Sequence, residues 1–522
     1  MPTLKIDGRE IIIEQGTSVL QAALQNGIDI PHYCYHPALT IAGSCRLCIV
    51  EVEGMPKLVP SCATTVSDGM VVLTDSEKVK EARKSILEFF LTNHPLDCPI
   101  CDKAGECKLQ DYTFQYGSAH SRFIEDKRVR PTKDLGGKIL LYRNRCVMCT
   151  RCVRFYEDIV GEAYLTVENR GYHSDISIFP GKELDHKMSG NIVELCPVGC
   201  LIDKDFLFHS RVWNLEVTKS ICPGCSTGCN INIEHKNNKI YRIRSRANSD
   251  VNSFWICDDG RYIFHKFEEL NRLKYPMKRT RDKLTKTTWE EALSILRDRL
   301  VLLKRSKEIK KMAVVGSFFA SNEENYLLYK IFHDEIGCDK FFVYQNKPDG
   351  EDLTFKNGFT IHGDKTPNKR GTELIIGNRS DFWAALKKGG IEVLVFFGND
   401  LNLMLTDKQK ELLKKLDFLV VFDIVDNDLA QHANVVLPTA GFAEHDGSFV
   451  NVDGRIQKFT TALQPPENVK PGWQILLSIY KAFNENTKLV SASDVMNEMA
   501  KTTKAFAGIS YFKVKDNGIQ LE

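Results

Sequence analysis

The chain has 522 residues, enough for roughly three or four domains of ordinary size. Apolar residues make up 43% and charged residues 26%, which is a globular composition and excludes disorder for most of the chain. The net charge of +2 gives no electrostatic footprint for nucleic acid, and no run approaches the roughly 18 apolar residues of a membrane span.

Cysteine is distributed very unevenly along the chain. Of the 17 cysteines, 16 lie between Cys34 and Cys257, and only Cys338 lies in the last 265 residues. Most of them occur in tight Cys-x-x-Cys groups, which favours metal ligation over a disulfide scaffold. The first residues pass directly into a strand-like pattern, so we expect no leader segment and a reducing cytoplasm.

The first half of the chain is predicted to contain short elements. Residues 4–13 indicate two strands and residues 18–26 a helix, which together make a small β-rich domain. A helix is expected over residues 76–93, with Asp75 as its N-cap. Residues 95–257 have too few apolar runs to form one conventional hydrophobic core. We therefore expect bound inorganic centres to hold this part of the chain in its fold.

The second half has the pattern of an α/β layer fold. Residues 312–316, 392–397 and 416–424 are apolar runs typical of buried parallel strands. Helices are expected between them over residues 322–336 and 406–416, on both faces of the sheet.

The first candidate ligand set consists of four cysteines at the spacing C-x10-C-x2-C-x13-C: Cys34, Cys45, Cys48 and Cys62. Four thiolates suit a [2Fe–2S] centre, and a loop can absorb a first gap longer than that of plant-type ferredoxins. Zinc also takes four thiolates, so a structural zinc site is the alternative at this point.

The second set has only three cysteines, Cys98, Cys101 and Cys107. A four-iron cube needs a ligand at every corner, and His94, at the spacing H-x3-C, is the candidate for the fourth. Imidazole in place of thiolate removes negative charge and tends to raise the potential. Without the cysteines, a histidine at a helix end would more often be a cap or a surface group.

The third set combines a local C-x2-C-x2-C run, Cys146, Cys149 and Cys152, with Cys196, which 43 intervening residues separate from Cys152. This grouping is typical of a four-iron centre, whose last ligand in bacterial ferredoxins is also followed by proline, whereas zinc sites usually bring two pairs. Cys200 could compete for the fourth position. Because Pro197 follows Cys196, we expect Cys196 to be the ligand and Cys200 a buried thiol outside the set.

The fourth set again has three local cysteines and one distant cysteine: Cys222, Cys225, Cys229 and Cys257. The four sets together use His94 and 15 of the 17 cysteines, and leave Cys200 and Cys338 unassigned.

Three stretches around these cysteines carry a family resemblance. Residues 31–48 end in Gly-Ser-Cys-Arg-Leu-Cys, residues 98–110 read CPICDKAGECKLQ, and residues 145–155 read RCVMCTRCVRF. In this order they resemble the large iron–sulfur subunits (the G subunits) of bacterial NADH:quinone oxidoreductase, which is respiratory complex I. Residues 423–457 are similar to the molybdopterin oxidoreductase fold.

The resemblance implies the fold class and the domains. An α+β N-terminal half, with a [2Fe–2S] ferredoxin-like β-grasp and further cluster-binding segments, would precede a truncated α/β molybdopterin-oxidoreductase-like domain. The implied parts are a [2Fe–2S] ferredoxin-like domain (1–75), a [4Fe–4S] segment with one histidine and three cysteine ligands (76–117), a ferredoxin-like [4Fe–4S] domain (118–215), a cluster subdomain of molybdopterin-oxidoreductase type (216–275) and the α/β domain without cofactor (276–522).

The resemblance also implies the function. The chain would be an electron-relay subunit of a translocase-class NADH dehydrogenase, with no catalytic residue and without the NADH or quinone site. Electrons would pass from the flavin subunit through the first, third and second sets to the two-cluster ferredoxin-like subunit. The first of these sets would hold a [2Fe–2S] cluster, and the other two would each hold a [4Fe–4S] cluster. The fourth set would hold an off-route [4Fe–4S] cluster, and no molybdenum cofactor is expected.

The implied setting is the peripheral arm of complex I at the cytoplasmic side of the bacterial inner membrane, with no nucleic acid partner. Basic residues near the ligands would either offset cluster charge or form structural ion pairs; they are Arg46, Lys103, Arg145, Arg151 and Arg154. Three alternatives remain: a relay subunit of an NAD-linked hydrogenase or formate dehydrogenase, a molybdenum or tungsten enzyme, and a multi-zinc scaffold.

Overall fold

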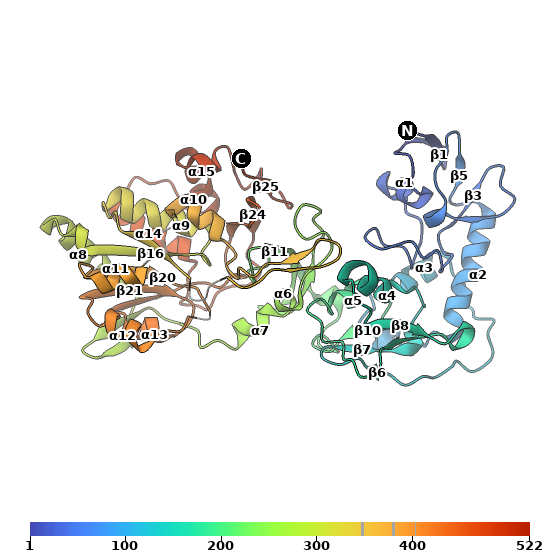
Figure 1. Ribbon diagram of the computed structural model, residues 1–522, viewed down its shortest axis with the longest axis horizontal. Coiled ribbons are helices and arrows are strands. Elements are labelled where there is room, and N and C mark those ends of the chain that lie inside the picture. The colour runs from blue at the N-terminus through green and yellow to red at the C-terminus, as the bar shows by residue number, and fades with distance from the viewer. Residues whose placement is uncertain (346–348, 378–381, 402) are drawn as a thin grey trace. The chain divides into compact units, whose positions relative to one another are not determined.

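The computed structural model describes residues 1–345, 349–377, 382–401 and 403–522, which form two compact units (Figure 1). Unit 1 comprises residues 1–215 and 355–359, and unit 2 comprises residues 216–354 and 360–522. The finer division into five parts stays a prediction. Within the described part of the chain, no helix is long and apolar enough to cross a membrane.

Unit 1 begins with a small sheet and one helix. The sheet has the strand order β2-β1-β5-β3-β4, with β1 (Thr3–Ile6), β2 (Arg9–Ile12), β3 (Ile49–Val52), β4 (Val59–Pro60) and β5 (Val71–Leu73). Asp7 and Gly8 turn β1 antiparallel to β2 at positive φ angles of 48° and 79°, which Gly8 adopts without strain. Ser18 caps α1 (Val19–Gln25) through a capping box. The predicted hairpin and first helix are confirmed.

The second helix, α2 (Glu77–Asn93), starts one residue later than Asp75 would set it. Ser76 is the N-cap, since its Oγ accepts a hydrogen bond from the Val79 N–H at 3.4 Å. The predicted Asp75 cap is therefore wrong, and Asp75 forms an ion pair with Lys80 at 3.1 Å instead. The helix ends at Asn93, and His94 is its C-cap.

The rest of unit 1 consists of short elements joined by loops, as predicted. They are α3 (Lys108–Tyr116), β6 (Lys133–Asp134), β7 (Ile139–Leu141), α4 (Arg151–Arg154), β8 (Leu165–Glu168), β9 (Asp175–Ile178), α5 (Asn191–Leu195) and β10 (Leu201–Asp203). Strands β10, β7 and β6 form one sheet, and β8 and β9 form a hairpin. After α4 the chain continues as a π-helical turn, Phe155–Val160, a feature often found near functional sites.

Unit 2 begins with an antiparallel three-stranded sheet. Its strands are β11 (Glu216–Ile221), β12 (Asn230–Lys236) and β13 (Lys239–Ser245), and the short helices α6 (Asp258–Arg261) and α7 (Ile263–Glu268) follow. The loop between β11 and β12 carries three cysteines of the fourth set, and Cys257 is the N-cap of α6.

A seven-stranded sheet forms the centre of unit 2, with the strand order β15-β14-β22-β21-β20-β16-β17. Its strands are β14 (Met277–Thr280), β15 (Lys283–Lys286), β16 (Met312–Ser317), β17 (Phe341–Tyr344), β20 (Val393–Phe397), β21 (Phe418–Asp423) and β22 (Val435–Pro438). The strands from β22 to β17 are parallel, which confirms the three predicted buried strands. The antiparallel edge hairpin β14–β15 was not predicted, because its side chains are mostly polar.

Alternate side chains of these strands enter two separate cores, one on each face of the sheet. On β20, Val393, Val395 and Phe397 join one core, whereas Leu394 and Phe396 join the other. Helices α8 (Trp289–Ser306), α9 (Asn322–Tyr329), α14 (Gly472–Phe483) and α15 (Ala492–Thr502) contribute to the first core, and α11 (Phe382–Lys388), α12 (Asp407–Leu413) and α13 (Asp428–His432) to the second. Helices on both faces are therefore confirmed (Figure 1).

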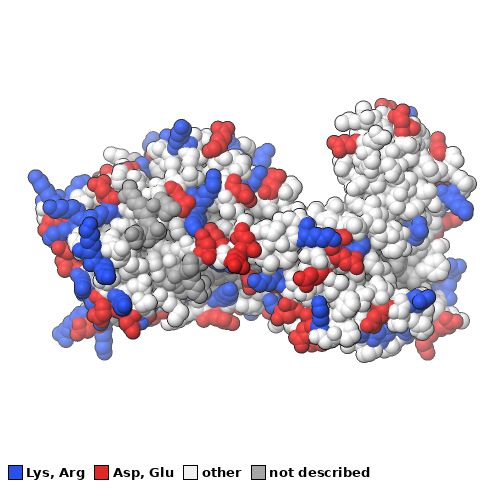
Figure 2. All heavy atoms as spheres, in the orientation of Figure 1, with Lys and Arg blue, Asp and Glu red and all other residues white. Residues whose placement is uncertain are grey.

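Smaller elements complete unit 2. They are β18 (Leu353–Thr354), β19 (Thr360–Ile361), α10 (Lys369–Ile376), β23 (Gly447–Val450), β24 (Arg455–Phe459) and β25 (Ile519–Gln520). The helix predicted over residues 322–336 is α9 followed by a second π-helical turn, Lys330–Glu335. On the face of unit 2 shown in Figure 2, Lys and Arg lie among Asp and Glu, as expected for a net charge near zero.

Candidate iron–sulfur centres

The first set gathers four buried thiols beside the N-terminal sheet. The Cys34 thiol is hydrogen-bonded to those of Cys45 and Cys62, and Cys62 is hydrogen-bonded to Cys48. The Cys45 Sγ also accepts backbone hydrogen bonds from the N–H groups of Tyr33 and Cys34, at 3.4 and 3.5 Å. The hydrogen bond from Cys62 lowers the pKa of Cys48 to about 7, which favours the thiolate that binds metals.

The second set lies between α2 and α3. Cys98 begins a 3-10 turn and is exposed, whereas Cys101 and Cys107 are buried, and Cys107 is the N-cap of α3. Cys101 interacts electrostatically with both other thiols. Cys101 therefore lies within electrostatic range of both other cysteines of the set.

His94 is half-buried at the end of α2. Burial, and then the positive charges of Arg145 and Lys127, lower its pKa to about 4. Its imidazole is therefore neutral at ordinary pH, which is the form that binds metals. His94 lines a cavity with Cys146 and Met148, and the described contacts do not join it to the three thiols, so its place in the second set rests on the sequence pattern.

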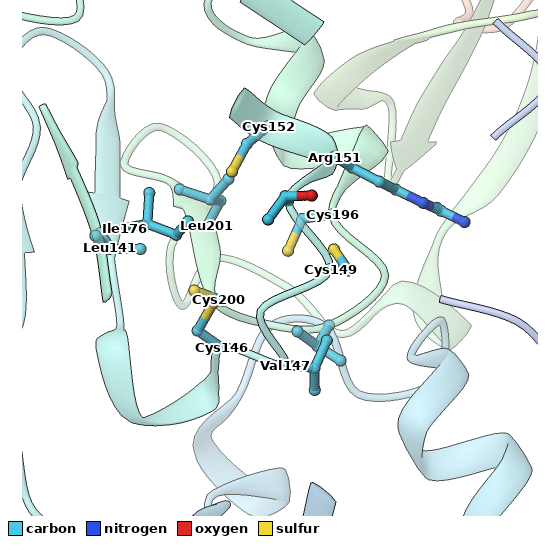
Figure 3. Close-up of a pocket in the computed structure, with 12 residues that line it drawn as sticks. Leu141, Cys146, Val147, Cys149, Arg151, Cys152, Ile176, Cys196, Cys200 and Leu201 are labelled. Atoms are coloured by element: carbon cyan, nitrogen blue, oxygen red, sulfur yellow. The ribbon is translucent and has the colours of Figure 1, made fainter. Parts of the chain in front are cut away.

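The third set lines one cavity in unit 1, and Figure 3 shows its cysteines around that space: Cys146, Cys149, Cys152 and Cys196. The apolar side chains of Leu141, Ile176 and Leu201 complete the wall. Met148 and Thr150 adopt positive φ angles of 49° and 56°, so the local run turns tightly enough to present its thiols together.

The thiols of the third set have strongly different proton affinities. Burial raises the pKa of Cys149 to about 12, because the surroundings disfavour a negative charge. A hydrogen bond from the Cys200 thiol lowers the pKa of Cys196 to about 6. Cys200 lines the same cavity, so it is buried as predicted but lies among the proposed ligands.

The fourth set lines a cavity of about 630 Å³ in unit 2, which its four cysteines share with side chains that include Lys365, Asn399 and His445. Burial raises the pKa of Cys257 to about 11. The Cys257 Sγ accepts a hydrogen bond from the Gly260 N–H at 3.4 Å. A Cβ at Gly260 would lie only 2.8 Å from the Cys222 Sγ, so the backbone of α6 approaches this set closely.

Two arginines of α4 connect the first and third sets. The Arg154 Nη2 donates to the backbone carbonyls of Cys34, at 2.7 Å, and of Cys149, at 2.9 Å. Arg151 donates to the carbonyl of Tyr35 and, at 3.2 Å, to that of Leu195. One guanidinium therefore binds the backbone of two ligand loops that are far apart in the sequence.

The loops that carry the second and third sets contact each other at Gly199 and Arg145. A Cβ at Gly199, in the Cys196–Cys200 loop, would overlap the Cys101 Sγ, so a larger residue there would displace the Cys101 side chain or the loop. Arg145 forms an ion pair with Asp97 at 2.8 Å, and its Nη1 donates to the Gly199 carbonyl at 3.4 Å. Arg145 and Asp97 directly precede Cys146 and Cys98, so this pair joins the two ligand loops.

The sequence pattern predicts that Arg145, Arg151 and Arg154 lie near the candidate ligands, but it does not predict their hydrogen-bond and ion-pair partners. Each of these partners is a backbone carbonyl or an acidic residue distant in the chain. The close approach at Gly199 could have been predicted only weakly, because a glycine often marks a place where two backbones lie close together.

Family models match the chain in the same order as the ligand sets. A "2Fe-2S iron-sulfur cluster binding domain" matches residues 1–77, an "NADH-ubiquinone oxidoreductase-G iron-sulfur binding region" residues 83–122, and an "NADH-quinone oxidoreductase subunit 3, ferredoxin-like domain" residues 136–202. A "Molybdopterin oxidoreductase Fe4S4 domain" matches residues 215–267, and "Molybdopterin oxidoreductase" matches residues 272–365 and 357–482.

Curated relatives carry related names. The G subunit of the NADH-quinone oxidoreductase of Rickettsia bellii is 41% identical over 345 residues, which are 66% of this chain and 50% of the relative. The resemblance to the large iron–sulfur subunits of this oxidoreductase is confirmed. The NADH-ubiquinone oxidoreductase 75 kDa subunit of Reclinomonas americana is 40% identical over 348 residues, 67% of this chain and 50% of the relative. The chain spans about half the length of these curated relatives.

The matches also confirm the fold class, an N-terminal [2Fe–2S] ferredoxin-like domain followed by molybdopterin oxidoreductase domains. The chain carries [2Fe–2S] and [4Fe–4S] binding domains, and its molybdopterin match is a likeness of fold. A solved NAD+-reducing [NiFe]-hydrogenase chain is 30% identical with a TM-score of 0.35, and the match covers 40% of this chain and 91% of that one.

Proposed function

We propose that the chain is an electron-transfer subunit of an NADH:quinone oxidoreductase. It would relay electrons from a flavin subunit through the first, third and second sets to a two-cluster ferredoxin-like subunit. The observation that carries this proposal is the pair of direct connections between ligand loops, Arg154 between the first and third sets and Gly199 with Arg145 between the third and second. These two connections support the proposed order of the sets, which differs from their order in the sequence.

The donor sets support the proposed cofactors. Cys34, Cys45, Cys48 and Cys62 would hold one [2Fe–2S] cluster, and the other three sets would hold [4Fe–4S] clusters. His94 would complete the second set, Cys196 the third and Cys257 the fourth. When bound, the clusters supply reversible one-electron chemistry. The protein holds the ligands in place, and no molybdenum is expected.

In this proposal, Arg145 and Arg154 both connect the ligand loops and add positive charge beside them. Buried guanidinium groups place positive charge beside loops that would hold anionic clusters, which favours the reduced state of each centre. Arg145 is also neutralised by Asp97, so its contribution is mainly to hold the two loops together. The off-route fourth set belongs to unit 2.

The proposed partners are a flavin and NADH-binding subunit, the two-cluster ferredoxin-like subunit and other peripheral-arm subunits, at the cytoplasmic side of the bacterial inner membrane. Large apolar side chains support a docking surface near the second set, since Leu96 and Ile100 flank the exposed Cys98 and are themselves exposed.

The experiment that tests this function is metal analysis of the anaerobically purified protein with its co-purifying subunits. We expect about 14 iron atoms per chain, matching acid-labile sulfide, and no molybdenum or tungsten. Electron paramagnetic resonance after reduction should show one two-iron and several four-iron signals. Molybdenum, or zinc in place of iron, would contradict the proposal, as would co-purification with a hydrogenase. Cys338→Ala is the matched control, because this buried cysteine lies outside the sets and should leave the iron content unchanged.

A further inference from the structure

The cavity of the third set is lined by five thiols, one more than a four-iron centre needs. Cys200 is only 2% exposed, and it lines this cavity together with Cys146 and Cys196. Figure 3 shows Cys200 next to Cys146 at the same cavity. Because a four-iron cube takes one protein ligand at each iron, one of the five thiols is in excess.

The position of Cys200 is set independently of Cys196. Its carbonyl accepts a hydrogen bond from the Tyr142 N–H at 2.7 Å, and the next residue, Leu201, pairs with Leu141 in the β10–β7 ladder. Gly199 is fixed against the Cys101 Sγ on its other side. The sheet therefore holds the Cys200 backbone, whereas Cys196 follows the end of α5.

Replacing Cys196 by Cys200 would leave the other three ligands in place. Both cysteines belong to one short loop, so the Cys146–Cys149–Cys152 run keeps its conformation whichever of them completes the set. We propose that Cys200 is a reserve ligand of the third centre, which takes the iron corner of Cys196 when that thiolate is absent or displaced. This inference rests on the proposed function, because it assumes that the third set binds a four-iron centre.

The exchange is balanced and needs no oxidant or reductant. Cys200 would form an iron–sulfur bond as the bond to Cys196 breaks, and the released Cys196 thiolate would take up the proton that the Cys200 thiol loses. In a Cys196 variant, the Cys200 proton is released to water when the cluster is built.

The test compares Cys196→Ala, Cys200→Ala and the double variant in the full chain. We expect both single variants to keep the wild-type iron and sulfide content, and the double variant to lose about four iron atoms per chain. The third-centre resonance signal of Cys196→Ala should persist with shifted g-values, because its ligand has a new geometry. A Cys196→Ala variant that loses as much iron as the double variant would overturn the proposal.

Cys149→Ala is the matched control within the same cavity. Cys149 belongs to the local run and not to the loop that Cys196 and Cys200 share, so Cys149→Ala should lose the centre even with Cys200 present. The two-iron signal of the first set reports whether each variant has folded. If Cys196→Ala loses that signal too, Cys196→Ser is measured against Cys196→Ser/Cys200→Ala, with the same two outcomes deciding. Failure of the proposed function would instead appear in the wild type, as missing iron.

Discussion

The two units hold their parts together by different means. In unit 1, ligand loops are joined by buried arginines that donate to backbone carbonyls, as Arg154 does for Cys34 and Cys149. In unit 2, parallel strands separate two apolar cores, and residues such as Phe397 and Leu394 fill opposite faces. A unit built on loops depends on what the loops bind, whereas a sheet with two cores is stabilised by apolar burial.

Removal of iron should produce the largest difference in protease resistance between the two units. Chelation under reducing conditions would remove the iron that we propose the loops of unit 1 bind, so we expect proteolysis to cut residues 95–215 of the intact chain. The seven-stranded sheet of unit 2 should stay protected. Mapping the cut sites by mass spectrometry with and without iron measures this, and equal protection of residues 95–215 in both states would contradict the comparison.

A core substitution should affect unit 2 alone. Phe422 is fully buried and stacks on Phe397, with ring centroids 5.3 Å apart. Phe422→Ala should lower the free energy of unfolding by about 3–5 kcal/mol through lost burial and a cavity. Denaturant unfolding followed by circular dichroism measures the change. Phe512 is 89% exposed, so Phe512→Ala should change stability by less than about 0.5 kcal/mol. Loss of the iron of unit 1 in Phe422→Ala would show that the units are not independent.

Unit 2 also has a predicted pH dependence. Burial raises the pKa of Glu323 from 4.5 to about 7, although Ser448 and Tyr511 donate hydrogen bonds to its carboxyl group. Between these pH values the unfolded chain releases a proton that the folded chain keeps, so stability falls as the pH rises. The loss across this window is about 3 kcal/mol.

Urea unfolding between pH 4.5 and 7.5 tests this sign. Glu323→Gln should flatten the dependence, because the amide does not titrate. The exposed Glu290 supplies the control, and Glu290→Gln should leave the slope as it is. A slope that survives Glu323→Gln would assign the effect to another buried group, such as Asp423, whose pKa burial raises to about 6.

Removing one connection between loops should have a smaller effect in unit 1. Arg154→Gln loses the charged hydrogen bonds to Cys34 and Cys149, which are worth about 1.5–3 kcal/mol each. The lost positive charge should lower the potentials of the first and third centres together, as followed by resonance-monitored redox titration. Arg297→Gln, at an exposed arginine, should change neither. If the potential of only one of the two centres shifted, Arg154 would not act on both.

The smallest structural change is expected from His94→Cys. The second centre should remain, with a lower potential, because a thiolate adds negative charge where the imidazole has none. Redox titration of the second-centre signal measures the shift, and His120→Cys, at an exposed histidine, is the control. An unchanged potential would remove His94 from the ligand set.

Local pattern was sufficient to predict much of this molecule. The buried strands of unit 2 follow from apolar runs such as 416–424, and the candidate ligand sets follow from cysteine spacing. The edge hairpin β14–β15 could not be predicted in this way, because exposed polar strands lack that periodicity. The partners of Arg154 and the position of Cys200 depend on tertiary contacts, which spacing does not encode.

The missing side chain at Gly199 would also limit how the proposed second and third centres could be tuned. Electron tunnelling slows steeply with distance, and the absence of a Cβ at Gly199 lets its loop approach Cys101 closely. Any larger residue would push the Cys196–Cys200 loop and Cys101 apart at once. An engineer could therefore not adjust one of these two centres at this position without disturbing the other.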